Sequence, residues 1–169
     1  MMTVREERES DYAAVYEVHE AAFGQPGEAR LVDALRASAS PRISLVAELD
    51  RQVVGHIFLS AVTVDGRSPE VRCAGLAPVG VRPGKQRAGV GSALIREALR
   101  QCPAAGWSVV FLLGDPVYYS RFGFTLASPR GFRYESEFFD SSFQLLELEH
   151  AALDGFGGWV RYHEAFSNL

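Results

Sequence analysis

Lysine is almost absent from this sequence of 169 residues. Of its 17 basic residues only Lys85 is a lysine, the rest are arginines, and 21 acidic residues bring the formal net charge to −4. The arginines form no dense basic run of the kind that marks a nucleic-acid-binding arm. We therefore expect no nucleic acid among the partners, whereas a small anionic ligand held at one local site stays open.

Cysteines are also few, and long hydrophobic runs are missing. Cys73 and Cys102 are the two cysteines, and their spacing matches neither a zinc site nor a disulfide framework, so we expect no metal. The apolar run Val109–Leu113 is far shorter than the ~20 residues of a membrane-spanning helix. Residues Met1–Ser10 lack the apolar stretch of a signal peptide. These absences favour a cytoplasmic protein with no membrane partner.

The composition that is present is that of an ordinary globular protein. Hydrophobic residues make up 47% of the chain and charged residues 22%, which argues against a disordered or fibrous chain. A chain of this length can bury a core without disulfide or metal crosslinks, and its length is typical of one domain. We expect a single domain over residues 1–169.

Hydrophobic periodicity predicts a mixed α/β chain. Helices are expected at Tyr12–Ala22, Glu28–Ser38 and Arg87–Arg100, with a short helix or turn at Pro116–Phe122. Strands are expected at Val4–Glu7, Ser44–Leu49, Gln52–Val62, Val71–Val81, Trp107–Leu113, Leu126–Tyr134, Phe143–Glu149 and Gly158–Tyr162. The strand–helix–strand succession in the centre implies a parallel pair. Turn residues at Asp50-Arg51 and Asp65-Gly66 imply antiparallel neighbours, so the sheet should be mixed, with helices on its faces.

A glycine-rich stretch precedes the helix expected at Arg87–Arg100. Gly84 and Gly89 have the separation of a P-loop, but Val90-Gly91 follows where Lys and Ser or Thr are needed. A dinucleotide fingerprint fails as well, because Leu94 stands where its third glycine belongs. Small residues here still let a ligand approach the backbone, and a helix N-terminus favours an anion. The alternative is that these glycines only turn the loop and allow close packing.

The same stretch resembles the acetyl-CoA motif of the GCN5-related N-acetyltransferase (GNAT) superfamily. Gln86-Arg87-Ala88-Gly89-Val90-Gly91 fits the pattern Q/R-x-x-G-x-G/A, and it follows a strand and opens a helix, as in that family. The stretch Leu113–Phe124 resembles the second family signature, a strand end followed by Tyr-x-x-x-Gly-Phe. Within it, the residue pattern of Gly114–Phe124 is most similar to a bacterial branch of small acetyltransferases. Asp115-Pro116 departs from the Asn that many members carry after the strand.

This resemblance implies a fold and a cosubstrate. The implied sheet is mostly antiparallel, with Val71–Val81 and Trp107–Leu113 as a parallel pair that splays apart, helices on both faces, and acetyl-CoA in the gap. The backbone of Val79–Val81 would pair with pantetheine, and Gln86–Ser92 would wrap the pyrophosphate. The residues implied to bind the cosubstrate are Val79, Gly80, Val81, Gln86, Arg87, Ala88, Gly89, Val90, Gly91, Ser92, Asp115, Pro116, Tyr119 and Phe122.

Acetyl transfer to an amine also requires polarisation of the thioester carbonyl and protonation of the departing thiolate. By resemblance, the backbone N–H of Val79 polarises the carbonyl and Tyr119 is the general acid. The alternative for Tyr119 is a packing role among neighbouring aromatic rings. No base is assigned: Glu48, Glu70 and His56 are candidates, but a lone histidine in an apolar strand is more often a core residue.

The implied function is transfer of an acetyl group from acetyl-CoA to a primary amine of a small molecule or a peptide, directly within a ternary complex. Two alternatives stay open. One is a catalytically silent domain of the same fold that binds or senses acyl-CoA. The other is an interaction module whose aromatic residues Phe138, Phe139 and Phe156 form a partner surface. A homodimer is compatible with the implied acetyltransferase and with both alternatives.

Overall fold

The computed structural model of the chain describes residues 1–65 and 72–169. Three residues that entered the sequence predictions, Gly66, Glu70 and Val71, lie outside this described part. Contacts divide the chain into two compact units. The first unit comprises Met1–Ser60, Ala77–Gln101 and His163–Leu169, and the second comprises Ala61–Leu76 and Cys102–Tyr162. The expectation of a single domain over residues 1–169 stays a prediction.

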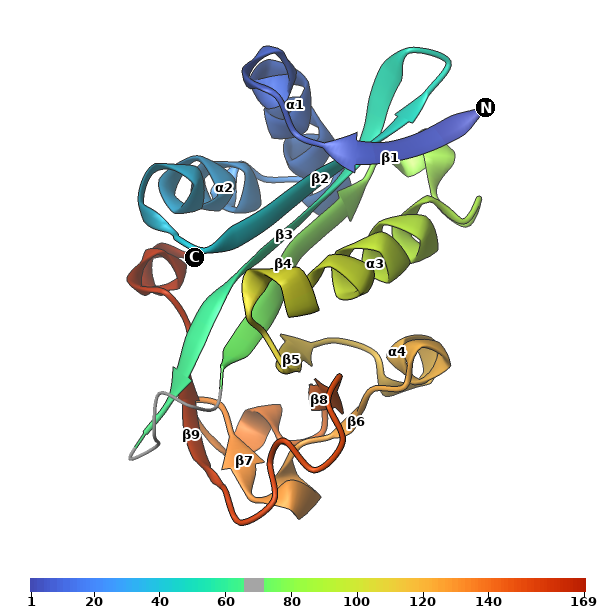
Figure 1. Ribbon diagram of the computed structural model, residues 1–169. Coiled ribbons are helices and arrows are strands. Elements are labelled where there is room, and N and C mark those ends of the chain that lie inside the picture. Colours follow the sequence, from blue (N-terminus) through green and yellow to red (C-terminus); the bar gives the residue numbers. More distant parts are fainter. Residues whose placement is uncertain (66–71) are drawn as a thin grey trace. The chain divides into compact units, whose positions relative to one another are not determined.

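The first unit combines strands with three longer helices (Figure 1). Its strands are β1 (Met2–Glu6), β2 (Arg42–Leu49), the first part of β3 (Gln52–Val64) and the last part of β4 (Cys73–Val81). Its helices are α1 (Tyr12–Phe23), α2 (Gly27–Ser38) and α3 (Val90–Gln101). β1 pairs with β2 and β2 with β3, both antiparallel. The hairpin expected at Asp50-Arg51 is confirmed, with positive φ angles of 50° and 67° at its two residues.

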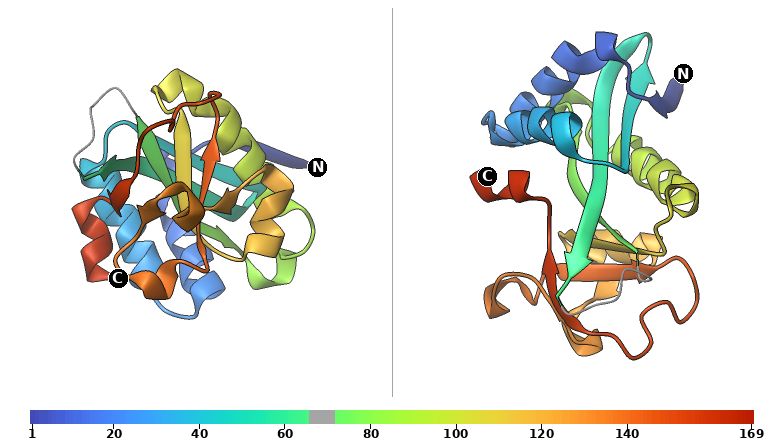
Figure 2. Two further views of the ribbon diagram at one scale, coloured as in Figure 1. Left: turned by 90° about the horizontal axis from the view of Figure 1, so that it is seen from below. Right: turned by 60° about the vertical axis from the view of Figure 1, so that its left-hand side comes forward.

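Helices cover both faces of the strands in the first unit (Figure 2). α1 and α2 lie on one face, where Val15, Val32 and Leu35 pack with Val46 and Phe58 of the strands in one buried cluster. α3 lies on the other face and packs closely on β3: a Cβ added at Gly55 would lie only 2.8 Å from the Val90 side chain. Gly55 therefore allows the helix that begins at Val90 to approach the strand closely.

The second unit is built around β5 (Val109–Leu113). β5 pairs with β4 in parallel, with Cys73 opposite Val109 and Gly75 opposite Phe111, and antiparallel with β8 (Phe143–Glu147). The remaining elements are α4 (Pro116–Tyr119), β6 (Thr125–Leu126), β7 (Phe132–Arg133) and β9 (Gly158–Arg161). β6 pairs with β8, and β9 pairs with β7 and with the end of β3. Stacked Phe111 and Phe143 rings, 5.4 Å apart, lie in its core.

The predicted fold class, a mostly antiparallel mixed sheet with a parallel central pair and helices, is confirmed. One expected strand is wrong: Leu126–Tyr134 is instead β6 and β7, with a 3-10 helix at Ser128–Arg130 between them. Pro129 has no N–H to donate to a strand neighbour, and Gly131 has a φ of 84°. In the described residues, no helix combines the length and apolar character needed to cross a bilayer.

Candidate active site

The end of β4 holds the backbone segment for which the family resemblance implies pairing with pantetheine. Gly80 is buried, whereas Val79 and Val81 on either side of it are partly exposed. A Cβ at Gly80 would lie 2.7 Å from Nδ1 of His19 on α1, so this position accepts only glycine without displacing that ring. The Gln86 side chain folds back and donates from Nε2 to the Val81 carbonyl over 3.1 Å. The motif that starts at Gln86 is thereby tied to the end of the strand.

The loop between β4 and α3 is open at its glycines. Arg87, Ala88 and Gly89 are exposed, and Arg87 and Gly89 have left-handed backbones with φ of 63° and 84°. A Cβ at Gly89 would meet no atom within 4 Å. These φ angles delay the helix, so α3 starts at Val90 and the predicted start at Arg87 is wrong.

The start of α3 has the properties of an anion site. The Ala93 N–H donates to the Gly89 carbonyl over 3.0 Å, while helix geometry leaves the N–H groups of Val90 and Gly91 without an intrahelical acceptor. The helix dipole adds a partial positive charge there, and Arg87 adds a full one. Open space, backbone donors and positive charge suit a phosphate or pyrophosphate group.

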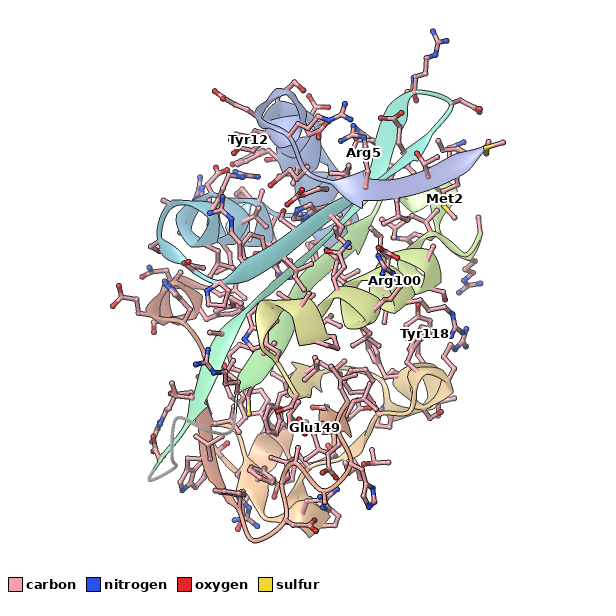
Figure 3. The ribbon with its side chains drawn as sticks, in the orientation of Figure 1. Met2, Arg5, Tyr12, Arg100, Tyr118 and Glu149 are labelled. Atoms are coloured by element: carbon pink, nitrogen blue, oxygen red, sulfur yellow. The ribbon has the colours of Figure 1, made fainter. Side chains whose placement is uncertain are left out.

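In the second unit, α4 positions Tyr119, the predicted general acid. Its ring lies 4.9 Å from the Tyr118 ring and 5.9 Å from the Phe124 ring, both edge-on, and Tyr118 is labelled beside α4 in Figure 3. A Cβ at Gly114 would overlap the Tyr119 ring, so the glycine after β5 makes room for it. Burial, and to a smaller extent Tyr118, raises the pKa of Tyr119 to about 12. Its hydroxyl therefore keeps its proton at neutral pH, as a proton donor must.

The residues around Tyr119 have evident structural roles. Asp115 Oδ1 accepts from the Val117 N–H over 2.9 Å and caps α4, and Pro116 occupies the first helical position, where a missing N–H costs nothing. Phe122 packs edge-on against Tyr118 at 5.5 Å. The Asp–Pro pair that departs from the family pattern thus forms a regular helix start. The predicted contacts of Asp115, Pro116 and Phe122 with a cosubstrate stay predictions.

Neither cysteine is a candidate nucleophile. Cys73 and Cys102 are both buried, and burial raises the pKa of each thiol to about 12. Thiolate is the reactive form of cysteine, and it is scarce in these two positions. Both cysteines are therefore structural.

The candidate bases have different surroundings. Glu48 accepts from the Arg5 guanidinium at 2.8 Å, and Glu70 lies outside the described residues. His56 is fully buried and both of its ring nitrogens are engaged: Nδ1 lies 2.8 Å from His19 Nε2, and Nε2 lies 2.8 Å from Ser44 Oγ. His56 is thus a core residue with partners, and it does not face a substrate itself.

Sequence reasoning missed His19, which is fully buried on α1. A signal was available, because His19 falls on the apolar stripe of its helix with Val15, Val18 and Ala22. A polar side chain on a buried stripe requires a partner. The apolar strand that carries His56 offered that partner, but nothing in the sequence shows which helix would cover which strand.

Comparisons with known proteins place these observations in a family. The family model for an acetyltransferase (GNAT) domain matches residues 3–127. The uncharacterized N-acetyltransferase YhbS of Escherichia coli K12 is 35% identical over 169 residues, covering 99% of this chain and 100% of the relative. YjhQ of the same organism, also an uncharacterized N-acetyltransferase, is 39% identical over 117 residues, covering 68% of this chain and 65% of the relative.

Two solved structures are similar over nearly the whole chain. The crystal structure of E. coli YhbS in complex with CoA has a TM-score of 0.90 and 34% identity, covering 98% of this chain and 92% of that one. A GNAT family acetyltransferase from Brucella melitensis in complex with acetyl-CoA has a TM-score of 0.80 and 41% identity, and 98% of each chain is covered.

Proposed function

This chain belongs to the GNAT acetyltransferase family, and from that premise we propose that it transfers the acetyl group of acetyl-CoA to a primary amine. The acceptor is an amine of a small molecule or a peptide, and transfer is direct, within a ternary complex. The observation that carries this proposal is the exposed glycine-rich loop that ends at the start of α3. The similar structures that were crystallised with CoA and acetyl-CoA support it.

In this proposal residues of the first unit bind the pyrophosphate and the pantetheine of the cosubstrate. The loop Gln86–Ser92 and the first turn of α3 hold the pyrophosphate, since Gly89 leaves the approach open and the helix N-terminus favours negative charge. The backbone of Val79–Val81 pairs with the pantetheine amides in the manner of an added strand. Asp115, Pro116, Tyr119 and Phe122 supply further contacts.

Two groups of the chain act on the reacting atoms. The Val79 N–H stabilises the negative charge that forms on the carbonyl oxygen when the amine nitrogen attacks, as an oxyanion donor does. When the C–S bond breaks, Tyr119 passes its hydroxyl proton to the departing thiolate. Its raised pKa of about 12 keeps that proton available at neutral pH.

Direct transfer is favoured over an acetyl-enzyme intermediate. Cys73 and Cys102 are buried, with thiol pKa values raised to about 12. Ser92 does not lie in the Gly-x-Ser-x-Gly turn of serine hydrolases. The amine therefore attacks the thioester itself.

The interaction-module alternative loses most of its predicted surface. Phe138 is 82% exposed, but Phe156 packs against the core cluster of the second unit and Phe139 contacts Tyr134 in an edge-on ring pair. A single exposed phenylalanine is ordinary at a protein surface. The silent acyl-CoA binder stays as the second candidate function, because it would need the same loop.

Thiol release decides between the candidates. Purified protein is mixed with acetyl-CoA and a broad panel of amines, free CoA is measured, and acetyl-CoA binding is measured separately by calorimetry. Release that depends on one class of amine supports the proposal. Binding without release for any amine supports the silent binder, and absence of binding refutes both. A homodimer and the cytoplasmic location stay predictions.

A further inference from the structure

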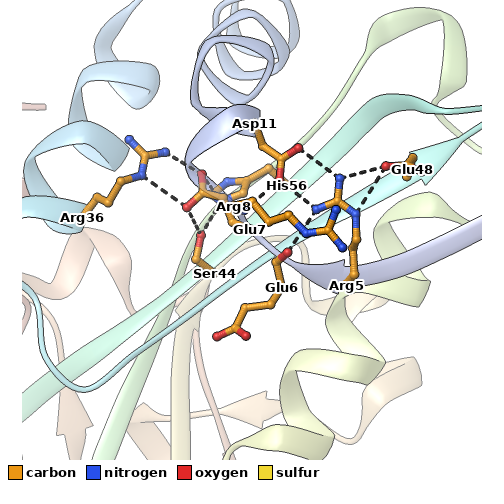
Figure 4. Close-up of polar contacts among 9 residues, drawn as sticks. All are labelled: Arg5, Glu6, Glu7, Arg8, Asp11, Arg36, Ser44, Glu48 and His56. Carbon is orange, nitrogen blue, oxygen red and sulfur yellow. Dashed lines mark hydrogen bonds and ion pairs between the residues drawn. The ribbon is translucent and has the colours of Figure 1, made fainter.

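A chain of four buried side chains runs through the first unit and ends near β4. Ser44 Oγ donates to Glu7 Oε2 over 2.8 Å. Ser44 Oγ also lies 2.8 Å from His56 Nε2. His56 Nδ1 in turn lies 2.8 Å from His19 Nε2. Both histidines have no exposed surface, and the Glu7 side chain is 5% exposed. Figure 4 shows the part of this chain formed by Glu7, Ser44 and His56.

The carboxylate at one end fixes every proton in the chain. An ionised carboxylate only accepts, so the Ser44 hydroxyl donates to Glu7 and must accept from His56 Nε2–H. His56 Nδ1 is then bare and accepts from His19 Nε2–H. His19 Nδ1 is bare in consequence. Burial lowers the pKa of His19 to about 4 and that of His56 well below its ordinary value, so both rings are neutral and each has one bare nitrogen.

The bare nitrogen at the end of the chain faces β4. Among the described residues, His19 Nδ1 has no hydrogen-bond partner although it is buried. It lies against Gly80, where a Cβ would come within 2.7 Å of it. A buried acceptor without a partner costs free energy and calls for an explanation. Here the bare nitrogen lies against the strand segment Val79–Val81, whose backbone the proposed function assigns to pantetheine and, at Val79, to the thioester carbonyl.

Charged neighbours surround Glu7, the residue at the other end of this series of hydrogen bonds, and keep its carboxylate a hydrogen-bond acceptor. The Arg36 guanidinium on α2 donates to Glu7 from Nε over 3.2 Å and from its terminal nitrogen over 2.6 Å, as drawn in Figure 4. Asp33 accepts from Arg36 at 2.8 Å, and the Tyr12 ring lies 3.7 Å below the guanidinium. The Glu7 N–H donates to the Ser44 carbonyl over 3.0 Å. These contacts fix the orientation of Glu7 and leave its Oε2 to accept from the Ser44 hydroxyl.

We propose that His19 Nδ1 accepts the proton that the attacking amine gives up, and that His56 and Ser44 relay it to Glu7. This inference rests on the proposed function. As the N–C bond forms and the C–S bond breaks, the amine proton passes to Nδ1 directly or through one water, a reach that general bases use. His19 gives its Nε2 proton to His56 Nδ1, His56 gives its Nε2 proton to Ser44 Oγ, and Ser44 gives its hydroxyl proton to Glu7 Oε2.

The proton balance of this relay is closed. One proton enters at His19 and one reaches the carboxylate, so Glu7 becomes neutral, both imidazoles stay neutral with their protons moved to Nδ1, and Ser44 is unchanged. No lasting imidazolium forms in a buried position where it would be costly. After the product leaves, the protons move back in the opposite direction: Glu7 returns its proton to Ser44, Ser44 gives one to His56 Nε2, His56 gives one to His19 Nε2, and His19 Nδ1 releases its proton to water, which restores the starting tautomers. His19 is the residue that meets the substrate proton, and His56, Ser44 and Glu7 act through it.

Tautomers test the relay without any activity. The protein has four histidines, so labelling them with the heavy nitrogen isotope gives a spectrum that can be assigned with His19→Gln and His56→Gln. We expect both His19 and His56 to be neutral, with the proton on Nε2, at neutral pH in the free protein. A proton on Nδ1 of His19 overturns the proposal, because no lone pair would then face Gly80.

Turnover tests the catalytic part. His19→Gln should lower kcat by about 10²–10⁴-fold, the usual contribution of a positioned base, and Ser44→Ala, which interrupts the relay but keeps both histidines, by about tenfold or more. Ser44→Thr keeps the hydroxyl and should restore kcat. The KM for acetyl-CoA and its calorimetric affinity should not change in any of the three. The solvent deuterium isotope effect on kcat should shrink in Ser44→Ala.

Each outcome has a separate meaning. If the wild-type protein turns over and folded His19→Gln keeps its kcat, the relay is wrong and the proposed function stands. Equal kcat loss in Ser44→Ala and Ser44→Thr, in proportion to lost thermal stability, also refutes the relay, since it indicates a packing role. If the wild type releases no CoA with any amine, the proposed function fails and the catalytic part of the relay falls with it. Should Ser44→Ala fail to fold, His19→Gln and the tautomers decide.

Discussion

Replacing Gly89 by Ala should weaken acetyl-CoA binding as well as destabilise the protein. Gly89 has a φ of 84°, in the left-handed region where an L-residue costs about 1–2 kcal/mol. A Cβ there meets no protein atom within 4 Å, so backbone strain is the whole expected cost. For a chain of this size that cost corresponds to a drop in Tm of roughly 2–8 °C.

The added methyl group also enters the open space through which a phosphate would approach the start of α3. We expect the Kd for acetyl-CoA to rise about tenfold or more, which corresponds to at least ~1.4 kcal/mol of binding free energy. The valine variant, which is larger and β-branched, should weaken binding further. Urea unfolding measures the loss of stability, and isothermal titration calorimetry measures the loss of acetyl-CoA affinity.

Gly24 provides a matched control within the same unit. It has a φ of 70° at the C-terminal end of α1, and a Cβ there also meets nothing within 4 Å. Gly24→Ala should therefore show a similar loss of stability with no loss of acetyl-CoA affinity. Wild-type affinity in folded Gly89→Ala, or an equal loss of affinity in Gly24→Ala, would refute the reasoning that places the pyrophosphate at this loop.

Three further predictions follow from the site and its charges. Tyr119→Phe should lower kcat by about 10²-fold or less without changing acetyl-CoA affinity, whereas Tyr118→Phe should keep wild-type turnover in steady-state kinetics; the reverse pattern would assign the acid to the other ring. The free energy of unfolding should fall as the pH drops from 6.5 towards 4, by about 3 kcal/mol from His19 alone, because burial lowers its folded pKa to about 4 and the unfolded chain takes up the proton first. Urea titrations across this pH range measure the loss of stability. If folded His19→Gln loses the same free energy of unfolding over this range, a group other than His19 causes the loss. Random duplex DNA should not bind at micromolar protein in fluorescence anisotropy, since the net charge is −4; tight, salt-sensitive binding would contradict this.

The central part of the fold could be predicted because its signals are local. Continuous apolar runs with a helix between them predicted β4, α3 and β5, and the parallel β4–β5 pair is confirmed. The start of α3 could not be located, because the left-handed backbone of Arg87 is unusual for a residue with a side chain. The stretch Leu126–Tyr134 differs from the single strand expected there because Pro129 lacks an N–H and Gly131 has a left-handed backbone, so the chain turns between β6 and β7.

The candidate site was predicted unevenly for a similar reason. The phosphate-binding loop is a continuous motif, so its residues could be named from the sequence. The buried chain from Glu7 to His19 joins residues of four different segments through side-chain hydrogen bonds. Such contacts depend on which helix covers which strand, and a single sequence does not contain that information.

The most direct test of the central claim follows the acetyl group itself. Acetyl-CoA that carries an isotope label in the acetyl group is incubated with the protein and an amine that stimulates CoA release, and both the amine and the protein are examined by mass spectrometry. Direct transfer predicts one labelled amide for each CoA released and no label on the protein. CoA release without labelled amide, or a label held on the protein before it reaches the amine, would contradict the account.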